Sequence, residues 1–223
     1  KTKLVTMRSG GGLVETVPLS PEPGLEPRKV QIMAVTEQLI AEHGYEALRL
    51  RDVAKSAGVS IGMIQHYFET REALLLETLG AASWRRAAEF VALEQGIEDP
   101  VRRVRALLGG SIADRGRCQV WMETCASATR HEELVSMIER IYGAWRTALR
   151  AALNDGVEAG AFNPQIPLDE VVNNIMVTID GVMVAVALQL RDFDAPHIVQ
   201  VIEQNAGRLL AYDFARPEPD PVR

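Results

Sequence analysis

The sequence is poor in the features that mark secreted and membrane-spanning proteins. Its 223 residues include two cysteines, Cys118 and Cys125, and on one helix these would lie about 10 Å apart along the axis, too far to form a disulfide. The longest unbroken apolar run is residues 182–188, far short of the roughly 20 residues of a transmembrane helix. The first residues contain no apolar signal segment. We therefore expect reduced thiols and a cytoplasmic protein without a membrane partner.

Spacings typical of catalytic and metal sites are also missing. The four histidines, at positions 43, 66, 131 and 197, lie far apart, and there is no HExxH, GxSxG or paired cysteine and histidine motif. The two cysteines could share a helix face and sense oxidants, but apolar packing is the simpler role. The sequence thus predicts no catalytic residues, no metal and no cofactor, so we expect that the protein is not an enzyme.

Prolines gather near the two ends of the chain. Residues 1–27 hold four prolines and three consecutive glycines, and residues 216–223 hold three prolines. These compositions predict a flexible N-terminal arm and a disordered tail. The chain between them shows no strand-like alternation and no repeat of 20 to 50 residues, so we expect an all-α protein.

Helix start and stop signals divide this central part. Glycines at 44, 58 and 160 come directly after helical patterns, as C-cap glycines do. Prolines at 100 and 167 come directly before helical patterns, where proline suits the start of a helix. The expected helices cover approximately residues 28–43, 51–56, a segment from Ser60, 70–94, a segment after Pro100, 118–129, 132–159, 169–190 and 196–212.

Residues 51–75 read RDVAKSAGVSIGMIQHYFETREALL, in which two short helical patterns flank a glycine, as in a helix-turn-helix. Gly58 permits the left-handed backbone that such a turn requires, and Ser60 can cap the second helix. Ile64 and Phe68 lie one helical turn apart, so we expect both to face the core. The outer face of the second helix then carries Ile61, Gly62, Met63, Gln65, His66 and Tyr67.

The chemistry of this outer face suits the major groove of DNA. Gln65 can donate to and accept from an adenine edge, and Ile61 and Met63 can contact thymine methyl groups. Gly62 would let the two backbones approach closely. These residue types therefore predict direct contact with bases.

Other residues around the outer face can reach phosphate oxygens. Tyr67, His66 and the amide groups after Ser60 are suitable donors, and Arg51 and Arg71 flank the face as phosphate clamps. The net charge is −6, and residues 28–79 contain six Lys or Arg against seven Asp or Glu, so binding would depend on a few placed cations. The alternative interpretation is that such spacing also occurs in helical proteins without DNA function, with His66 an ordinary surface residue.

Residues 30–79 resemble the DNA-binding domain of TetR-family transcriptional regulators. The similarity lies in Gly44-Tyr45, Arg51-Asp52-Val53-Ala54, Ala57-Gly58-Val59-Ser60, Gln65-His66-Tyr67-Phe68 and Arg71-Glu72-Ala73-Leu74-Leu75. The sequence departs from the family pattern in three places. Gln65 stands where tyrosine is usual, and Tyr67 stands where histidine is frequent. Arg49-Leu50 stands where a capping Thr or Ser is usual, which suggests an arginine–phosphate contact. The resemblance implies DNA contacts for eight residues: Arg51, Ile61, Gly62, Met63, Gln65, His66, Tyr67 and Arg71. With Arg49 and Ser60, which their own chemistry identifies, they make ten predicted DNA-binding residues.

The resemblance extends over nearly the whole chain after the arm. It implies an N-terminal three-helix helix-turn-helix DNA-binding domain at residues 28–75 and a C-terminal helical ligand-binding and dimerisation domain at residues 76–215. Two segments, SIGMIQHYF and Trp121-Met122-Glu123, most resemble the choline-responsive BetI-like branch of the family. The implied partners are double-stranded DNA with a palindromic operator, a second copy of the chain and an unidentified small-molecule effector.

Residues 171–190 are apolar on more than one side, which is typical of a helix buried on both sides. One side carries Val172, Ile175, Ile179, Val182 and Val186, and another carries Val177, Val184, Ala185 and Leu188. With the last helix, this segment resembles the family's four-helix dimer interface. The alternative is a central core helix of one chain.

Polar and aromatic residues of the C-terminal part are candidates for an effector site, because an aromatic set with a carboxylate could hold a cation. They are Trp121, Met122, Cys125, Tyr142, Trp145, Asn174, Thr178, Asp180 and Met183. The alternative is that both tryptophans are core residues and that Asp180 bonds locally.

We therefore expect a ligand-responsive repressor that a small molecule releases from its operator. The competing hypothesis is a helical small-molecule carrier or adaptor without DNA function.

Overall fold

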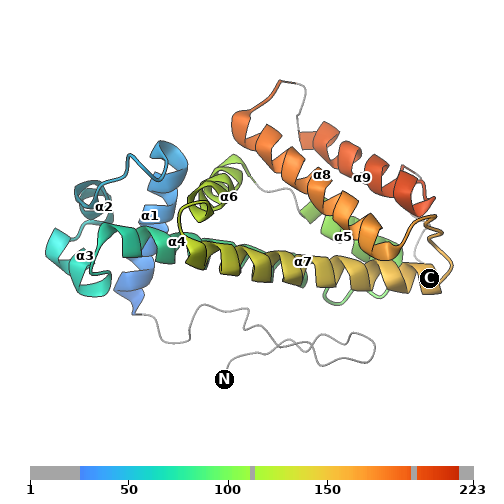
Figure 1. Ribbon diagram of the computed structural model, residues 1–223, viewed down its shortest axis with the longest axis horizontal. Helices are drawn as coiled ribbons and strands as arrows, with labels where there is room; N and C mark the ends of the chain where they lie inside the picture. The colour runs from blue at the N-terminus through green and yellow to red at the C-terminus, as the bar shows by residue number, and fades with distance from the viewer. Residues whose placement is uncertain (1–25, 111–113, 192–194, 216–223) are drawn as a thin grey trace. The chain divides into compact units, whose positions relative to one another are not determined.

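The structure is a computed structural model that describes residues 26–110, 114–191 and 195–215. These residues form nine helices and no strand, which confirms the all-α prediction (Figure 1). The helices are α1 (Pro27–His43), α2 (Leu50–Ala57), α3 (Ile61–Tyr67), α4 (Arg71–Ala92), α5 (Pro100–Gly110), α6 (Arg115–Ala128), α7 (Glu132–Glu158), α8 (Leu168–Leu188) and α9 (Ala195–Leu210). The predicted arm and tail lie outside the described residues, apart from Glu26 and Pro27, where α1 begins.

Local capping signals set several helix ends as expected. The Ser60 hydroxyl accepts a hydrogen bond from the Met63 amide at 3.1 Å, which starts α3. The Thr70 hydroxyl does the same for the Ala73 amide at 3.0 Å at the start of α4. Gly58 ends α2 in the left-handed region, with φ 64° and ψ 37°. The helix expected from residue 118 instead begins at Arg115, because the preceding aspartate accepts from a first-turn amide.

The chain forms two compact units, and their division falls within α4 and α7. One unit comprises residues 1–89 and 114–143, and the other comprises residues 90–113 and 144–223. The predicted domain boundary between residues 75 and 76 does not coincide with this division, because α6 and the first part of α7 group with the helix-turn-helix.

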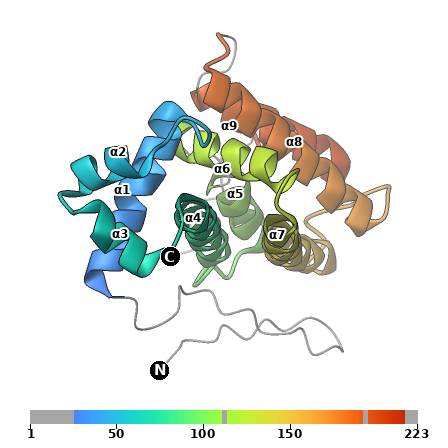
Figure 2. The same ribbon diagram turned by 60° about the vertical axis from the view of Figure 1, so that its left-hand side comes forward.

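The first unit has its core where α1, α2 and α3 meet. Ile32, Val53, Ile64, Phe68 and Leu74 are each at most 3 % exposed, so the inward side of the helix-turn-helix is as predicted. Helix α6 packs against α1 (Figure 2). This contact covers the side of α1 that α2 and α3 leave open.

In the second unit, α8 lies alongside α9, and α9 also packs against α5 (Figure 1). The inward side of α8 carries Val172, Ile175, Ile179 and Val182, all at most 4 % exposed. Beyond α9, the chain turns back through Tyr212 and Phe214 to meet Phe162, and the three rings pack with centroids 4.8 to 6.2 Å apart.

Candidate functional site

The outer face of α3 is open to solvent along its length. Ile61 is 43 % exposed and Met63 39 %, whereas Ile64, the next residue in the chain, is fully buried. Gln65 and His66 are exposed as well. Exposed apolar side chains and exposed hydrogen-bonding groups thus share this helix, which suits a partner with apolar and polar features.

Gly62 is not required by packing inside the protein. A Cβ atom at this position would meet only the Ser60 Oγ, at 3.9 Å. The space above this position is therefore available for close approach of another backbone, as the sequence analysis expected for DNA.

The predicted cations differ in how they are held. Arg51 is 67 % exposed at the side chain, with its Nε 3.8 Å from the adjacent Asp52 carboxylate. Arg49 is exposed and sits at the N-cap of α2, which has no side-chain capping hydrogen bond. The start of α2 thus carries two exposed arginines and no side-chain cap.

Arg71 is held differently from the phosphate clamp that was predicted. Its guanidinium donates to the carbonyl oxygens of Leu48 at 2.6 Å, of Glu46 at 3.3 Å and of Tyr45. These carbonyls belong to the loop between α1 and α2, so Arg71 ties that loop to the start of α4. Sequence reasoning missed this role because the partners lie more than 20 residues away.

Tyr67 donates its hydroxyl hydrogen to the Glu26 carboxylate at 2.6 Å. This hydrogen bond is the main cause that raises the pKa of the Tyr67 phenol. Glu26 was not among the predicted site residues, since it falls at the end of the predicted arm. A phosphate that accepts from Tyr67 would have to displace this carboxylate.

A second polar group of residues joins the α1–α2 loop to its surroundings. The Tyr45 amide donates to Glu123 on α6 at 3.2 Å, and the Tyr45 hydroxyl donates to Glu72 on α4 at 2.9 Å. The His131 Nε2 lies 3.3 Å from the same Glu72 oxygen. Burial, followed by the Glu72 hydrogen bond, raises the pKa of Tyr45. One loop of the DNA-binding segment is thereby fixed by α4 and α6 together.

Four of the predicted effector residues fall in the first unit. Trp121 is 4 % exposed, and its ring packs against that of Tyr142 with centroids 5.8 Å apart. Met122 and Cys125 are half-buried. The structure therefore brings the aromatic pair together.

The other five predicted effector residues fall in the second unit, and those on α8 do not share one side. A helix turns about 100° per residue, so Met183 points opposite to Asn174, with Asp180 nearer to Met183. Asn174 donates to the Glu170 carbonyl, and Thr178 donates to the Asn174 carbonyl while accepting from Asn205 of α9. Asn174 and Thr178 thus bond locally, on a different face from Asp180 and the buried Met183.

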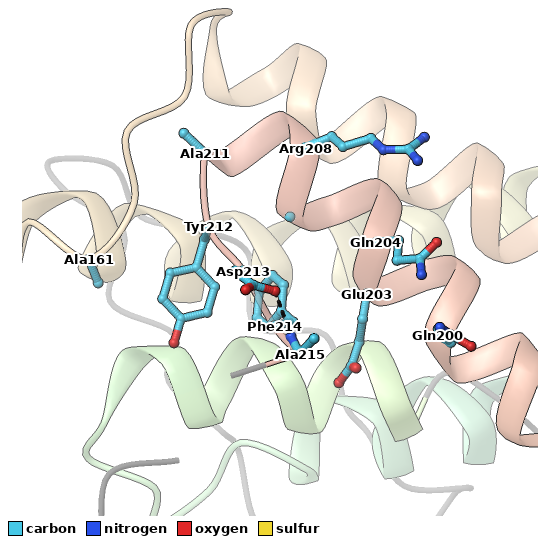
Figure 3. A pocket seen from close by; sticks show the side chains of 11 residues that line it. Ala161, Gln200, Glu203, Gln204, Arg208, Ala211, Tyr212, Asp213, Phe214 and Ala215 are labelled. Atoms are coloured by element: carbon cyan, nitrogen blue, oxygen red, sulfur yellow. Dashed lines mark hydrogen bonds between the residues drawn. The ribbon is translucent and has the colours of Figure 1, made fainter. Parts of the chain in front are cut away.

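The fifth residue, Trp145, is buried and packs against Phe90 with ring centroids 5.9 Å apart. A separate cavity of about 700 Å³ opens between α9 and the segment after it (Figure 3). Its walls include Glu203, Arg208 and Asp213, and none of the predicted effector residues lines it. Sequence reasoning did not identify this groove.

The solvent side of α8 carries an apolar stripe, defined as Val177, Gly181, Val184 and Leu188. The three large side chains are 71 %, 41 % and 60 % exposed, in chain order. A Cβ atom at Gly181 would meet nothing within 4 Å, so the glycine leaves room above the helix. By length and composition alone, helix α8 could cross a membrane. Half of its apolar stretch is buried inside the protein, and buried core helices meet the same criteria of length and composition.

The helix-turn-helix, its open outer face and the second helical part together define a ligand-responsive DNA-binding transcriptional regulator. Comparison with protein families supports this class in both parts of the chain. Residues 32–78 match the model of bacterial regulatory proteins of the tetR family, and residues 99–211 match that of the C-terminal domain of BetI-type transcriptional repressors. The chain belongs to the TetR family of transcriptional regulators, with a C-terminal domain of the BetI type.

Curated relatives agree with this assignment. The chain is 28 % identical to the HTH-type transcriptional regulator BetI 1 of Chromohalobacter salexigens, over 89 % of this chain and 94 % of that protein. It is 26 % identical to BetI of Rhizobium meliloti (76 % and 83 % covered) and 26 % identical to the HTH-type transcriptional repressor KstR2 of Mycobacterium tuberculosis (64 % and 72 %).

Solved structures show the same fold. A TetR-family regulator from Rhodococcus sp. aligns with a TM-score of 0.71 at 22 % identity, covering 83 % of this chain and all of that one. A regulator from Saccharomonospora viridis, solved in complex with choline, aligns with a TM-score of 0.73 at 23 % identity, covering 79 % and 93 %.

Proposed function

We propose that this protein is a repressor that reads a palindromic operator through the outer face of α3. The observation that carries this proposal is the exposure of Ile61 and Met63 on α3, whose Ile64 is fully buried. Apolar side chains in that position suit thymine methyl groups, and Gln65 beside them suits an adenine edge. Arg49, Arg51 and Tyr67 then position the helix on phosphates.

The operator would be palindromic because the protein would bind as a homodimer. The apolar stripe on α8 supports this arrangement, since an exposed row of large apolar side chains is a surface that a second copy can cover. A two-fold dimer places two copies of α3 on half-sites one helical turn of DNA, or a multiple of it, apart. The protein would act in the cytoplasm, where its operator is located.

The effector would be a small molecule that lowers operator affinity. The aromatic pair of Trp121 and Tyr142 supports an aromatic site for a cation, and the regulator from Saccharomonospora viridis was solved with choline. A 100-fold loss of DNA affinity requires a coupling free energy of about 2.7 kcal/mol.

Selection of random duplex DNA by the purified protein, at about 150 mM salt, tests the DNA function. We expect an enriched palindrome that a Gln65→Ala, Tyr67→Ala double variant no longer selects. Gln65→Ala alone should relax preference at one base position, and Tyr67→Ala alone should weaken binding to all sequences. Enrichment that the double variant leaves unchanged would mean that α3 does not read the DNA. No enrichment would favour the small-molecule carrier.

Choline titrated into the operator complex tests the effector. We expect dissociation of the complex and a saturable change in tryptophan fluorescence. Trp121→Leu should abolish the release, whereas Trp84→Leu, which changes a tryptophan outside the predicted site, should retain it. Loss of release in both variants would point to general damage, and retention in both would remove Trp121 from the site.

A further inference from the structure

The start of α1 lies against the end of α3, and an acidic side chain there contacts the DNA-reading helix (Figure 2). Glu26, the N-cap residue of α1, accepts a hydrogen bond from the Tyr67 hydroxyl at 2.6 Å. The Lys29 ammonium of α1 lies 5.1 Å from the centre of the ring of Phe68, the residue after α3. These contacts place a carboxylate beside the residue that we expect to donate to a DNA phosphate.

The Glu26 carboxylate does not cap the helix that it precedes. An N-cap side chain usually accepts from amides of the first helical turn, but Glu26 makes no such hydrogen bond. Its side chain is directed to Tyr67 instead, and the residue is exposed. Burial therefore does not hold the carboxylate in this place. When it leaves Tyr67, the positive end of the α1 dipole favours a new position beside the first turn.

The bond to Tyr67 is of the kind that a DNA phosphate would make. A carboxylate oxygen and a phosphate oxygen are both charged acceptors for a hydroxyl hydrogen, and 2.6 Å is within the usual range for such a bond. This bond is the main cause that raises the pKa of Tyr67, while the charge of Arg28 lowers it. An anion thus already holds the hydroxyl in the protein without DNA.

We propose that Glu26 competes with DNA phosphate for the Tyr67 hydroxyl and thereby lowers the affinity of the protein for DNA. Binding requires that the carboxylate give up a charge-assisted hydrogen bond, and its negative charge then stays close to the phosphate that replaces it. Both effects oppose the complex with every sequence, because every sequence presents phosphates. The inference rests on the proposed phosphate contact of Tyr67.

Binding of a labelled random-sequence duplex at about 50 mM salt separates the two effects. Glu26→Gln removes the charge but keeps an oxygen that can accept from Tyr67, so affinity should rise by about 3-fold. Glu26→Ala removes the acceptor as well, and affinity should rise by about 10-fold. In a Tyr67→Phe background no hydroxyl remains to compete for, so the two changes should have equal and smaller effects.

Glu139→Gln is the matched control, because it removes the same charge from an exposed residue of α7. It should raise affinity less than Glu26→Gln does. A control that raises affinity at least as much would assign the effect to net charge. An excess of Glu26→Ala over Glu26→Gln that persists in the Tyr67→Phe background would show that the hydroxyl has no part in it. Either result would overturn the proposal.

A measurement without DNA tests the contact itself. In protein isotope-labelled at the tyrosine Cζ atoms, the Tyr67 resonance is the one that Tyr67→Phe lacks, and it reports ionisation of the phenol. Its midpoint should lie at lower pH in Glu26→Ala than in the wild type, because the main cause of the raised pKa is gone. An unchanged midpoint would show that Glu26 does not hold the hydroxyl and would overturn the inference.

The outcomes also distinguish this inference from the proposed DNA function. Binding that no Glu26 variant strengthens would contradict the inference alone and leave operator reading by α3 intact. Binding by none of the proteins would contradict the proposed function, and the inference with it.

Discussion

Aspartate at both Val177 and Val184 should convert the proposed dimer into monomers and weaken operator binding by about 100-fold or more. Both side chains belong to the apolar stripe on α8, where they are 71 % and 41 % exposed in the single chain. In a two-fold dimer each substitution occurs twice, so four carboxylates would be buried in an apolar interface without partners. A monomer would hold only one half-site.

Sedimentation equilibrium and operator titration measure the two effects. The matched control is Val135→Asp, because Val135 on α7 is also 41 % exposed but lies outside the stripe. It should leave both mass and affinity unchanged. A double variant that stays dimeric would show that the stripe is not the interface. Monomers with full operator affinity would instead remove the need for a dimer in DNA binding.

Replacement of Arg71 by alanine should destabilise the protein by about 2–3 kcal/mol even without DNA, because one charged donor holds three backbone carbonyls of the same loop. Its guanidinium donates to the carbonyls of Tyr45, Glu46 and Leu48. Loss of these bonds frees the α1–α2 loop, which in turn positions α2 and α3. DNA binding should then weaken indirectly.

Urea unfolding without DNA and the salt dependence of operator binding separate this role from a phosphate contact. Arg51→Ala is the comparison, since Arg51 is 67 % exposed and holds no loop. It should leave unfolding unchanged and reduce the salt slope of binding by about 1. If Arg71→Ala behaves in the same way as Arg51→Ala, Arg71 is the phosphate clamp that the family resemblance implied.

Most helix ends could be predicted because their causes lie within a few residues. Ser60 and Thr70 cap helices through amides three positions away, and Gly58 ends α2 through its own backbone angles. The inward placement of Ile64 and Phe68 likewise follows from their spacing of one turn. The exposed face of α3 was therefore predictable in full, although its contact with DNA remains a prediction.

The parts that sequence analysis missed depend on residues distant in the chain. Arg71 contacts carbonyls 23 to 26 positions away, and Glu123 accepts from an amide 78 positions away. No periodicity encodes such pairs. By contrast, the separation of Asn174 from Met183 was available in the sequence, since nine residues amount to a half-turn difference in direction on a helix.

The first unit is built from two separate stretches of the chain. This affects the order in which its contacts can form while the protein is synthesised. The 78 residues between Tyr45 and Glu123 take the ribosome roughly 4–16 s to add. Once residue 75 has been added, the helix-turn-helix is complete in sequence, but for the rest of that time α6 does not yet cover α1. A nascent chain therefore contains α3 before it contains α6, whose Glu123 holds the α1–α2 loop. The contacts that fix this loop join residues far apart in the chain. They form late, because the long stretch of chain between the partners must close before they can meet.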